Sequence, residues 1–292
     1  MGRSLRRPRF SLALSALFFL SLTLSLSGCN VVRSTVAYFR STDHFIVYPQ
    51  DPRVLFEPGA EAFIPEVVAA LPPAIEKVAS GQYLPFSEPV RVYLCASDES
   101  YYRLTGTKAC AVVTHKLFLS RTLLEEPQIV PLYLTHELSH LHLHQRLGIW
   151  RLQKLPPWFK EGLAALVSGG GGAQRVTDSQ AIEAMNQGHT FIPDEGRGVL
   201  ASLFFPRYGS YWHLENQMFY HQAMLFVGFL REKDEAAFRR MLLGIQSGSP
   251  FAVSLEKAYG LPLADLWRHY LQEIKVQANS SANHPLPTWA KG

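Results

Sequence analysis

Apolar residues recur at helical spacing along much of the chain, in several separate blocks. The first block carries Pro72-Pro73 in its middle, where proline predicts a break or kink because it lacks the backbone N–H. The second block ends at Gly148 in the manner of a helix C-terminus, and Pro156-Pro157 predicts the start of the third. Helices are therefore predicted over residues 61–78, 129–147, 158–167, 215–231, 234–246 and 262–275.

Two segments that precede the long helix at residue 129 have the composition of strands. Residues 90–94 alternate between apolar and polar positions, and residues 109–120 are rich in β-branched and aromatic side chains. A glycine run at residues 168–172 then predicts a flexible loop. The predicted fold class is α+β, with a mixed N-terminal part up to about residue 168 and a mostly helical part from about residue 175.

The first 28 residues have the layout of a secretory signal. Four arginines and no acidic residue precede an uncharged run of leucine and serine at residues 11–27. A retained membrane anchor is the weaker interpretation, because a spanning helix needs about 20 apolar residues and this run is shorter. Removing these four arginines leaves 24 basic residues against 24 acidic ones, so the mature chain is neutral overall and predicts no nucleic-acid partner.

The end of the signal segment predicts a lipid anchor. Leu26-Ser27-Gly28-Cys29 resembles the bacterial lipobox, which implies diacylglycerol on the sulfur of Cys29 and acylation of its amine. Several acyl chains would make the attachment stable, since one chain alone binds only marginally. Asn30 stands where an aspartate would imply retention at the inner membrane, so the resemblance implies the periplasmic face of the outer membrane.

Two further cysteines, Cys95 and Cys110, fall in the candidate strand segments at residues 91–97 and 108–120. If those strands are neighbours, the two cysteines are candidates for a disulfide in an oxidising compartment. Two buried thiols are the alternative, because the sequence does not supply the Cβ geometry that a bridge needs.

A metal-binding pattern lies in the long predicted helix, at His136-Glu137-Leu138-Ser139-His140. Residues four apart on a helix lie one turn above each other, so both imidazoles can reach one ion from the same face. Glu137 sits beside that face and can take a proton from a water at the metal. This is the HExxH pattern of zinc peptidases, in which the glutamate is the general base.

A catalytic zinc ion takes three protein ligands, and the next predicted helix offers the third. Its sequence follows the pattern W-x-x-E-G-x-A from Trp158, with Glu161 placed 21 residues after His140. The two motifs together resemble the gluzincin clan of metallopeptidases. The resemblance implies a thermolysin-like catalytic core, one zinc ion per chain held by His136, His140 and Glu161, and Glu137 as the base.

Two departures from the clan affect the assignment. The aminopeptidase branch carries a glutamate upstream that grips the free amine of the substrate, whereas residues 106–110 here hold no carboxylate. Internal cleavage and other exopeptidase modes therefore both stay open. Several relatives also place a carboxylate one turn after the ligand glutamate to orient a histidine. Ala165 stands there, so another residue must take that role or the site is weaker.

Other parts of the site are predicted from the same resemblance. The strand at residues 110–119 corresponds to an edge strand that an extended peptide could join. Tyr220 corresponds to a tyrosine that donates to the oxyanion, with His221, Tyr211 and His213 as rivals. His144, one turn further along the metal helix, is expected to face solvent or to support the ligands. The glycine loop is predicted to gate access to the site.

The sequence therefore predicts a zinc metallopeptidase at the bacterial envelope that hydrolyses peptide or protein substrates. Residues 29–58 would be a tether and extended segment, residues 59–278 the catalytic domain, and residues 279–292 a flexible tail. The alternative is a lipoprotein of the same fold that works in binding or assembly with little catalysis. A non-peptide amide of the cell wall is a further substrate class that the sequence allows. Oligomeric state has no signal in the sequence.

Overall fold

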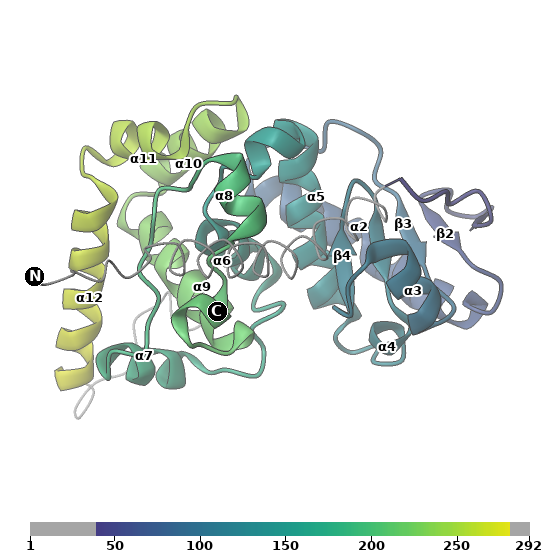
Figure 1. Cartoon of the computed structure of the whole chain (residues 1–292), viewed down its shortest axis with the longest axis horizontal. Helices are drawn as coiled ribbons and strands as arrows, with labels where there is room; N and C mark the ends of the chain where they lie inside the picture. The colour runs from purple at the N-terminus through teal and green to yellow at the C-terminus, as the bar shows by residue number, and fades with distance from the viewer. Residues whose placement is uncertain (1–38, 281–292) are drawn as a thin grey trace, which may run out of the picture.

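The computed structural model describes residues 39–280 of the chain (Figure 1). The predicted signal segment, the predicted lipid site Cys29 and the tail from residue 281 lie outside the described residues. Between residues 39 and 280, no helix combines the length and the apolar character needed to cross a membrane.

A mixed five-stranded sheet with the order β1-β2-β3-β5-β4 lies at one end of the molecule (Figure 1). The three central strands, β2, β3 and β5, are parallel to one another and fully buried, whereas β1 and β4 pair antiparallel at the two edges. The strands are β1 Ile46–Val47, β2 Val54–Phe56, β3 Val92–Leu94, β4 Ala111–Val113 and β5 Leu117–Leu119. All five precede the long helix α5, so the predicted α+β class is confirmed.

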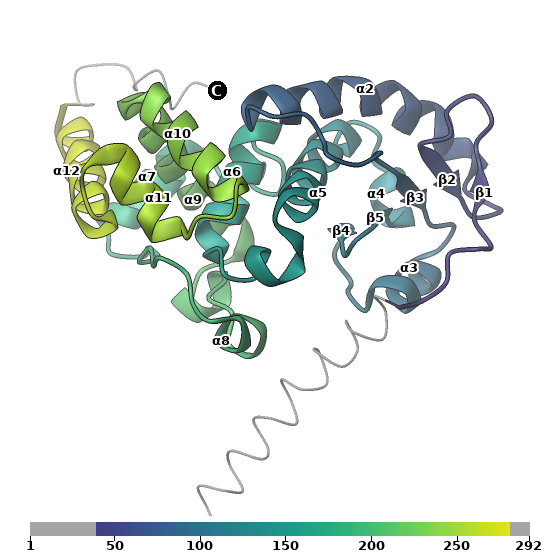
Figure 2. The ribbon, with the colours of Figure 1, turned by 90° about the horizontal axis from the view of Figure 1, so that it is seen from above.

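The remaining elements are helical, and those after α5 gather at the other end of the molecule (Figures 1 and 2). Their bounds are η1 Glu61–Phe63, α2 Ile64–Gly81, α3 Asp98–Thr105, α4 Arg121–Leu124, α5 Val130–Leu152, α6 Pro157–Ser168, α7 Asp178–Asn186, α8 Val199–Phe204, η2 Gly209–Trp212, α9 Asn216–Lys233, α10 Glu235–Gln246, α11 Phe251–Tyr259 and α12 Leu263–Ser280. α5 lies between the sheet and the helical part and contacts both.

The segment at residues 109–120 is a hairpin and not the single strand that its composition predicts. The chain reverses between β4 and β5, where the Thr114 N–H donates to the Lys116 carbonyl at 3.0 Å. The reversal places β4 outside β5, so β4 forms the edge of the sheet. The sequence therefore predicted an edge strand before the metal helix correctly but did not predict the turn within it.

The predicted break in the first helix does not occur, because α2 continues through both Pro72 and Pro73. An internal proline costs about 3 kcal/mol through its missing donor and its clash with the preceding turn. Val67, Leu71 and Val78 of the same helix are fully buried, and the helix packs along α5. Burying each such side chain contributes about 1.5–3 kcal/mol, which offsets the two prolines.

Helices α6 and α9 approach each other closely at Gly162. A Cβ atom on Gly162 would lie 2.5 Å from the carbonyl oxygen of Ala223 and 2.9 Å from a methyl carbon of Val227. Only glycine permits this approach, which brings the C-terminal helices against the helix that carries Glu161. Gly228 lies in α9 in the same interface, but a Cβ there would meet only a Leu166 methyl carbon at 3.7 Å.

Gly162→Ala is expected to destabilise the protein by about 2 kcal/mol or more, because the added methyl group overlaps backbone atoms that cannot move without separating the helices. Gly228→Ala is the matched control and is expected to stabilise by up to about 1 kcal/mol, since alanine favours helix and the site has room. Urea unfolding of both variants measures the difference. Equal effects of the two substitutions would contradict the close packing described here.

Candidate metal centre

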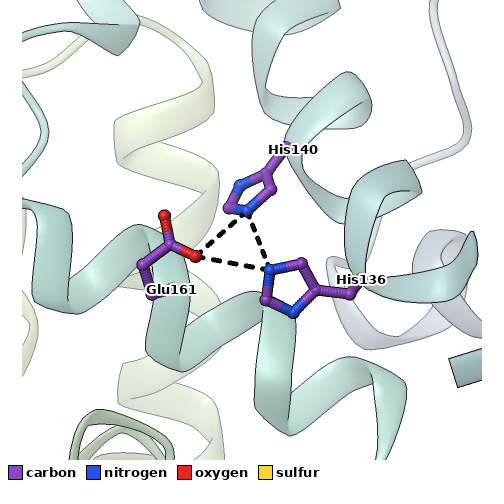
Figure 3. A group of neighbouring side chains, drawn as sticks. All are labelled: His136, His140 and Glu161. Carbon is purple, nitrogen blue, oxygen red and sulfur yellow. Dashed lines mark hydrogen bonds and ion pairs between the residues drawn. The ribbon is translucent and has the colours of Figure 1, made fainter. Parts of the chain in front are cut away.

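Two histidines of α5 and one glutamate of α6 point their side chains at a common centre (Figure 3). His136 and His140 are one turn apart, and their Nε2 atoms lie 3.1 Å from each other. Oε2 of Glu161 lies 3.3 Å from each of these nitrogens. The structure therefore brings together the three residues that the sequence predicted as metal ligands.

The separations between these three atoms fit a small tetrahedral ion. Zinc binds imidazole nitrogen and carboxylate oxygen at about 2.0–2.1 Å, and two ligands of a regular tetrahedron of that size lie about 3.3–3.4 Å apart. The three measured edges, 3.1, 3.3 and 3.3 Å, are close to this value. Within residues 39–280 no other group of three His, Cys, Asp or Glu residues is placed to hold a metal ion.

The carboxylate of Glu161 is held in its ionised form. Burial by itself raises the pKa of this group, but the charge of His140 and hydrogen bonds from both histidines outweigh burial and hold the pKa well below its usual range. The lowered pKa favours the ionised carboxylate, the form in which glutamate binds a metal.

A backbone carbonyl fixes the orientation of His136. Its Nδ1–H donates to the carbonyl oxygen of Gly171 at 2.8 Å, and its Nε2 is turned toward Glu161. Such a partner on the second ring nitrogen selects the tautomer that binds metal. The carbonyl of Gly171 therefore takes the role that sequence comparison with the clan assigned to a carboxylate at position 165.

The glycine loop after α6, which its composition predicted to be a flexible gate, is tied to the site by hydrogen bonds. The N–H of Gly171 donates to Ser168 Oγ at 2.8 Å, and the N–H of Gly170 donates to the Ala165 carbonyl at 2.8 Å. A Cβ on Gly171 would lie 2.6 Å from the Leu132 carbonyl oxygen of α5. Glycine at this position therefore permits close packing against the metal helix.

Glu137 lies beside the three ligands without joining them. Its side chain is 8% exposed and lines the same cavity of about 320 Å³. Burial raises the pKa of Glu137 to about 7, with the charge of Glu161 adding to the rise and His136 and the Val113 N–H opposing it. A carboxyl group with a pKa near neutrality can both accept and return a proton, as a general base must.

The raised pKa predicts a pH-dependent cost to stability in the metal-free protein. Below the usual value of 4.5 the carboxyl is neutral in both the folded and the unfolded chain, so no cost arises. Between pH 4.5 and about 7 the unfolded chain loses its proton while the folded chain keeps it, so stability falls across this range. Above pH 7 both chains are ionised and the cost is complete, at roughly 3 kcal/mol, the free energy of a shift of this size.

Glu137→Gln removes that ionisation, so the variant is expected to match the wild type near pH 4 and to be more stable by roughly 3 kcal/mol near pH 8. Urea unfolding with a chelator present measures this difference. A difference that does not change with pH would contradict the buried position of Glu137.

Two tyrosines from the helical part of the chain complete the cavity. Tyr220 of α9 stacks on His136, with ring centroids 6.0 Å apart, and Tyr208 precedes η2. The negative charge of Glu161 and then burial raise the pKa of Tyr220, and burial followed by Glu161 and Glu137 raises that of Tyr208. Both hydroxyls therefore stay protonated and can donate. Sequence reasoning predicted Tyr220 and missed Tyr208, which lies in a loop with no periodic pattern.

The other residues that the sequence offered as oxyanion donors or as support for the ligands lie outside this cavity. Tyr211 and His213 are exposed, and Nε2 of His221 is 2.5 Å from Asp178 Oδ1. His144 is part of a different cavity, on the side of α5 toward His115. None of these four candidates lines the cavity that contains His136 and Glu161.

Cys95 and Cys110 are free thiols, so the candidate disulfide is not formed. Cys95 follows β3 and Cys110 precedes β4, and β5 lies between those strands. Two strand spacings amount to about 9–10 Å, beyond the Cα separation of about 7 Å that a bridge tolerates. The condition for a bridge, that the two segments be neighbouring strands, is not met, because the turn after β4 places β5 between them.

The edge strand β4 also lines this cavity, along its residues Ala111 to Val113. The cavity therefore combines a three-residue group that could hold a metal, a buried carboxyl, the edge of a sheet and three phenols, since Tyr133 of α5 lines it together with Tyr208 and Tyr220. No protein-family model matches this chain, and no curated protein matches it significantly. The functional argument accordingly depends on the geometry and chemistry of this cavity.

Proposed function

We propose that the protein is a zinc-dependent metallopeptidase of the gluzincin type, with one zinc ion held by His136, His140 and Glu161. One observation carries this proposal. The separations between the three ligand atoms match the edges of a zinc-sized tetrahedron. A buried carboxyl with a pKa near neutrality, that of Glu137, lines the same cavity. A binding site alone has no need of that carboxyl.

Each residue has a separate role in this mechanism. When bound, zinc would polarise the scissile carbonyl and acidify a water molecule. Glu137 accepts a proton from the attacking water and returns it to the leaving amine. Tyr220 and Tyr208 are protonated donors placed to hydrogen-bond the oxyanion as negative charge develops on it. Gly171 keeps the ring of His136 in the orientation that the reaction requires.

The edge strand supports a peptide as the substrate. An extended chain that pairs with the free edge of β4 is held by main-chain hydrogen bonds and lies along the wall of the cavity. A peptide bond can then reach the centre defined by the three ligands. The shape of the cavity and the edge of the sheet favour a peptide over a compact small molecule.

We also propose that the chain acts at the bacterial envelope, anchored through a lipid on Cys29 and facing the periplasm, at the outer membrane. The basic and apolar pattern of residues 1–28 and the Leu26 to Cys29 sequence support this location. Labelling with a radioactive fatty acid tests it, because Cys29→Ser is expected to abolish the label. A labelled Cys29→Ser chain would overturn the anchor.

The alternative, a binding or assembly factor without catalysis, loses its particular support. That support was the absence of a carboxylate at Ala165, one turn after Glu161, and the Gly171 carbonyl supplies a partner for the ring of His136 instead. No other feature of the cavity favours binding over hydrolysis.

A mixed peptide library tests the proposed activity. The full-length chain, purified in detergent and loaded with zinc, is incubated with the library, and products are identified by mass spectrometry. We expect cleavage that a chelator stops and that added zinc restores. A zinc-loaded protein that cleaves no peptide but releases ammonia or amine from an amide of the cell wall would move the substrate to that class. No hydrolysis of either kind would contradict the proposal.

Tyr220→Phe is expected to reduce kcat by about 10²–10³-fold, since loss of one oxyanion donor has an effect of this size. The zinc content should not change, because the hydroxyl is not among the ligand atoms. Tyr211→Phe is the control, as Tyr211 is exposed and lies outside the cavity. If Tyr220→Phe leaves kcat unchanged and Tyr208→Phe reduces it, Tyr208 is the donor.

A further inference from the structure

A lysine with no described role lies inside the candidate metal cavity. Lys160 precedes Glu161 on α6, is 9% exposed, and lines the same cavity as His136 and His140. Lysine is rarely buried to this extent unless it is paired. Its position next to a ligand therefore needs a physical explanation.

The ammonium group of Lys160 makes no hydrogen bond and no ion pair with any residue between 39 and 280. Other lysines of the fold differ in this respect. Lys77 donates to the Ser168 carbonyl at 2.8 Å, and Lys116 donates to Thr42 Oγ1 at 2.8 Å. The cost of removing an ammonium from water is several kcal/mol unless a partner compensates it.

Glu161 does not supply that partner. It is the one carboxylate whose charge acts on Lys160, but its Oε2 atom is directed at the two histidines, 3.3 Å from each. With a metal ion in place, the charge of Glu161 would be shared with that ion. Lys160 therefore lines the cavity without a hydrogen-bonded or ion-paired carboxylate of its own among residues 39–280.

The same cavity is also lined by uncharged hydrogen-bond donors. Gln153, just after the end of α5, and the protonated Tyr208 line it together with Lys160. An ammonium, an amide and a phenol form a set that suits a carboxylate, which accepts hydrogen bonds through both of its oxygens. A neutral peptide would leave the lysine unpaired.

We propose that Lys160 anchors a subsite for a carboxylate of the peptide substrate, a proposal that builds on the peptidase function proposed above. Two sources of carboxylate fit this chemistry. A C-terminal carboxylate would make the protein a carboxypeptidase, whereas an aspartate or glutamate side chain would make it an endopeptidase that cleaves beside acidic residues. Lys160 is a specificity residue in either case and does not take part in bond cleavage.

The test measures peptide binding separately from turnover. The zinc-loaded, full-length chain carrying Glu137→Gln is mixed with three libraries of acetylated hexapeptides, and retained peptides are counted by mass spectrometry after filtration. The first library has a free C-terminus and no acidic residue, the second has an amidated C-terminus and no acidic residue, and the third has an amidated C-terminus and one aspartate or glutamate. The same protein without metal is measured in parallel.

We expect the first or the third library to be retained about ten-fold or more above the second, the effect of one charge-assisted hydrogen bond. The first library reports a C-terminal carboxylate and the third an acidic side chain. Lys160→Met should abolish the preference and Lys160→Arg should retain part of it. Lys154→Met is the matched control, because Lys154 is exposed and lies outside the cavity.

The two proposals fail in different ways. A chain that binds no zinc contradicts the peptidase function, while a Lys160-dependent preference in the metal-free chain would still support the subsite. A chain that binds zinc but retains the three libraries equally, or retains none, overturns the subsite alone. A preference for carboxylate peptides that survives Lys160→Met also overturns the subsite. If Lys160→Met loses zinc but keeps the preference, the subsite is overturned as well, and the role of Lys160 is to support Glu161.

Discussion

Glu137→Gln is expected to reduce peptide hydrolysis by about 10²–10⁴-fold, the range attributed to a single general base, while zinc stays bound. Glutamine has the shape of glutamate, but its amide cannot accept the proton of the attacking water. Glu137 lines the cavity beside His136 without being one of the three ligand atoms, so the metal site should be unaffected.

Single-turnover hydrolysis of a peptide found in the library screen measures this loss, and elemental analysis of the same sample measures zinc. Glu126→Gln provides the control, since it makes the same change at an exposed position before α5. If Glu137→Gln keeps full activity, another group is the base and the proposed mechanism is wrong. If the variant loses zinc as well as activity, Glu137 is part of the metal site.

Glu161→Ala is expected to lower zinc affinity by more than about 100-fold, because losing even a partner of a ligand costs 10–100-fold. The substitution removes the only negatively charged ligand atom of the three and leaves two imidazoles, which form an incomplete site. Hydrolysis should be lost together with the metal. This effect separates a ligand from a base, since the Glu137→Gln protein keeps its zinc.

Competition with a chelator of known affinity measures zinc binding in the wild type, in Glu161→Ala and in Glu183→Ala. Glu183 is an exposed carboxylate on α7, and its removal should not change the affinity. About one zinc ion per wild-type chain is expected, as for a catalytic site. Equal affinity in Glu161→Ala and the wild type would rule out Glu161 as the third ligand.

The parts of the site that the sequence predicted are those set by local geometry. The spacing of His136 and His140 places both rings on one face of a helix in any fold, because the helical repeat is fixed. Glu161 and Tyr220 were predicted through a resemblance to a known clan, and the structure brings both to the same cavity as the histidines. Periodicity likewise predicted the helices that became α5 and α6.

The parts that the sequence did not predict depend on contacts between distant segments. The bond from His136 to Gly171 spans 35 residues, and a glycine run read by itself indicates only flexibility. Cys95 and Cys110 are separated by β5, which no local pattern could reveal. Tyr208 and Lys160 became candidates only after packing showed which side chains share a cavity.

The hydrogen bond between His136 and Gly171 also affects how this protein can change by mutation. Where a carboxylate side chain orients a metal-binding histidine, one codon change removes it. Here the acceptor belongs to the main chain, so no substitution at position 171 deletes it directly. A mutation can instead change the path of the loop, because a larger side chain at Gly171 would push the loop away from Leu132. Insertions and deletions between residues 168 and 172 should therefore be tolerated far less than the polar surface of this loop suggests.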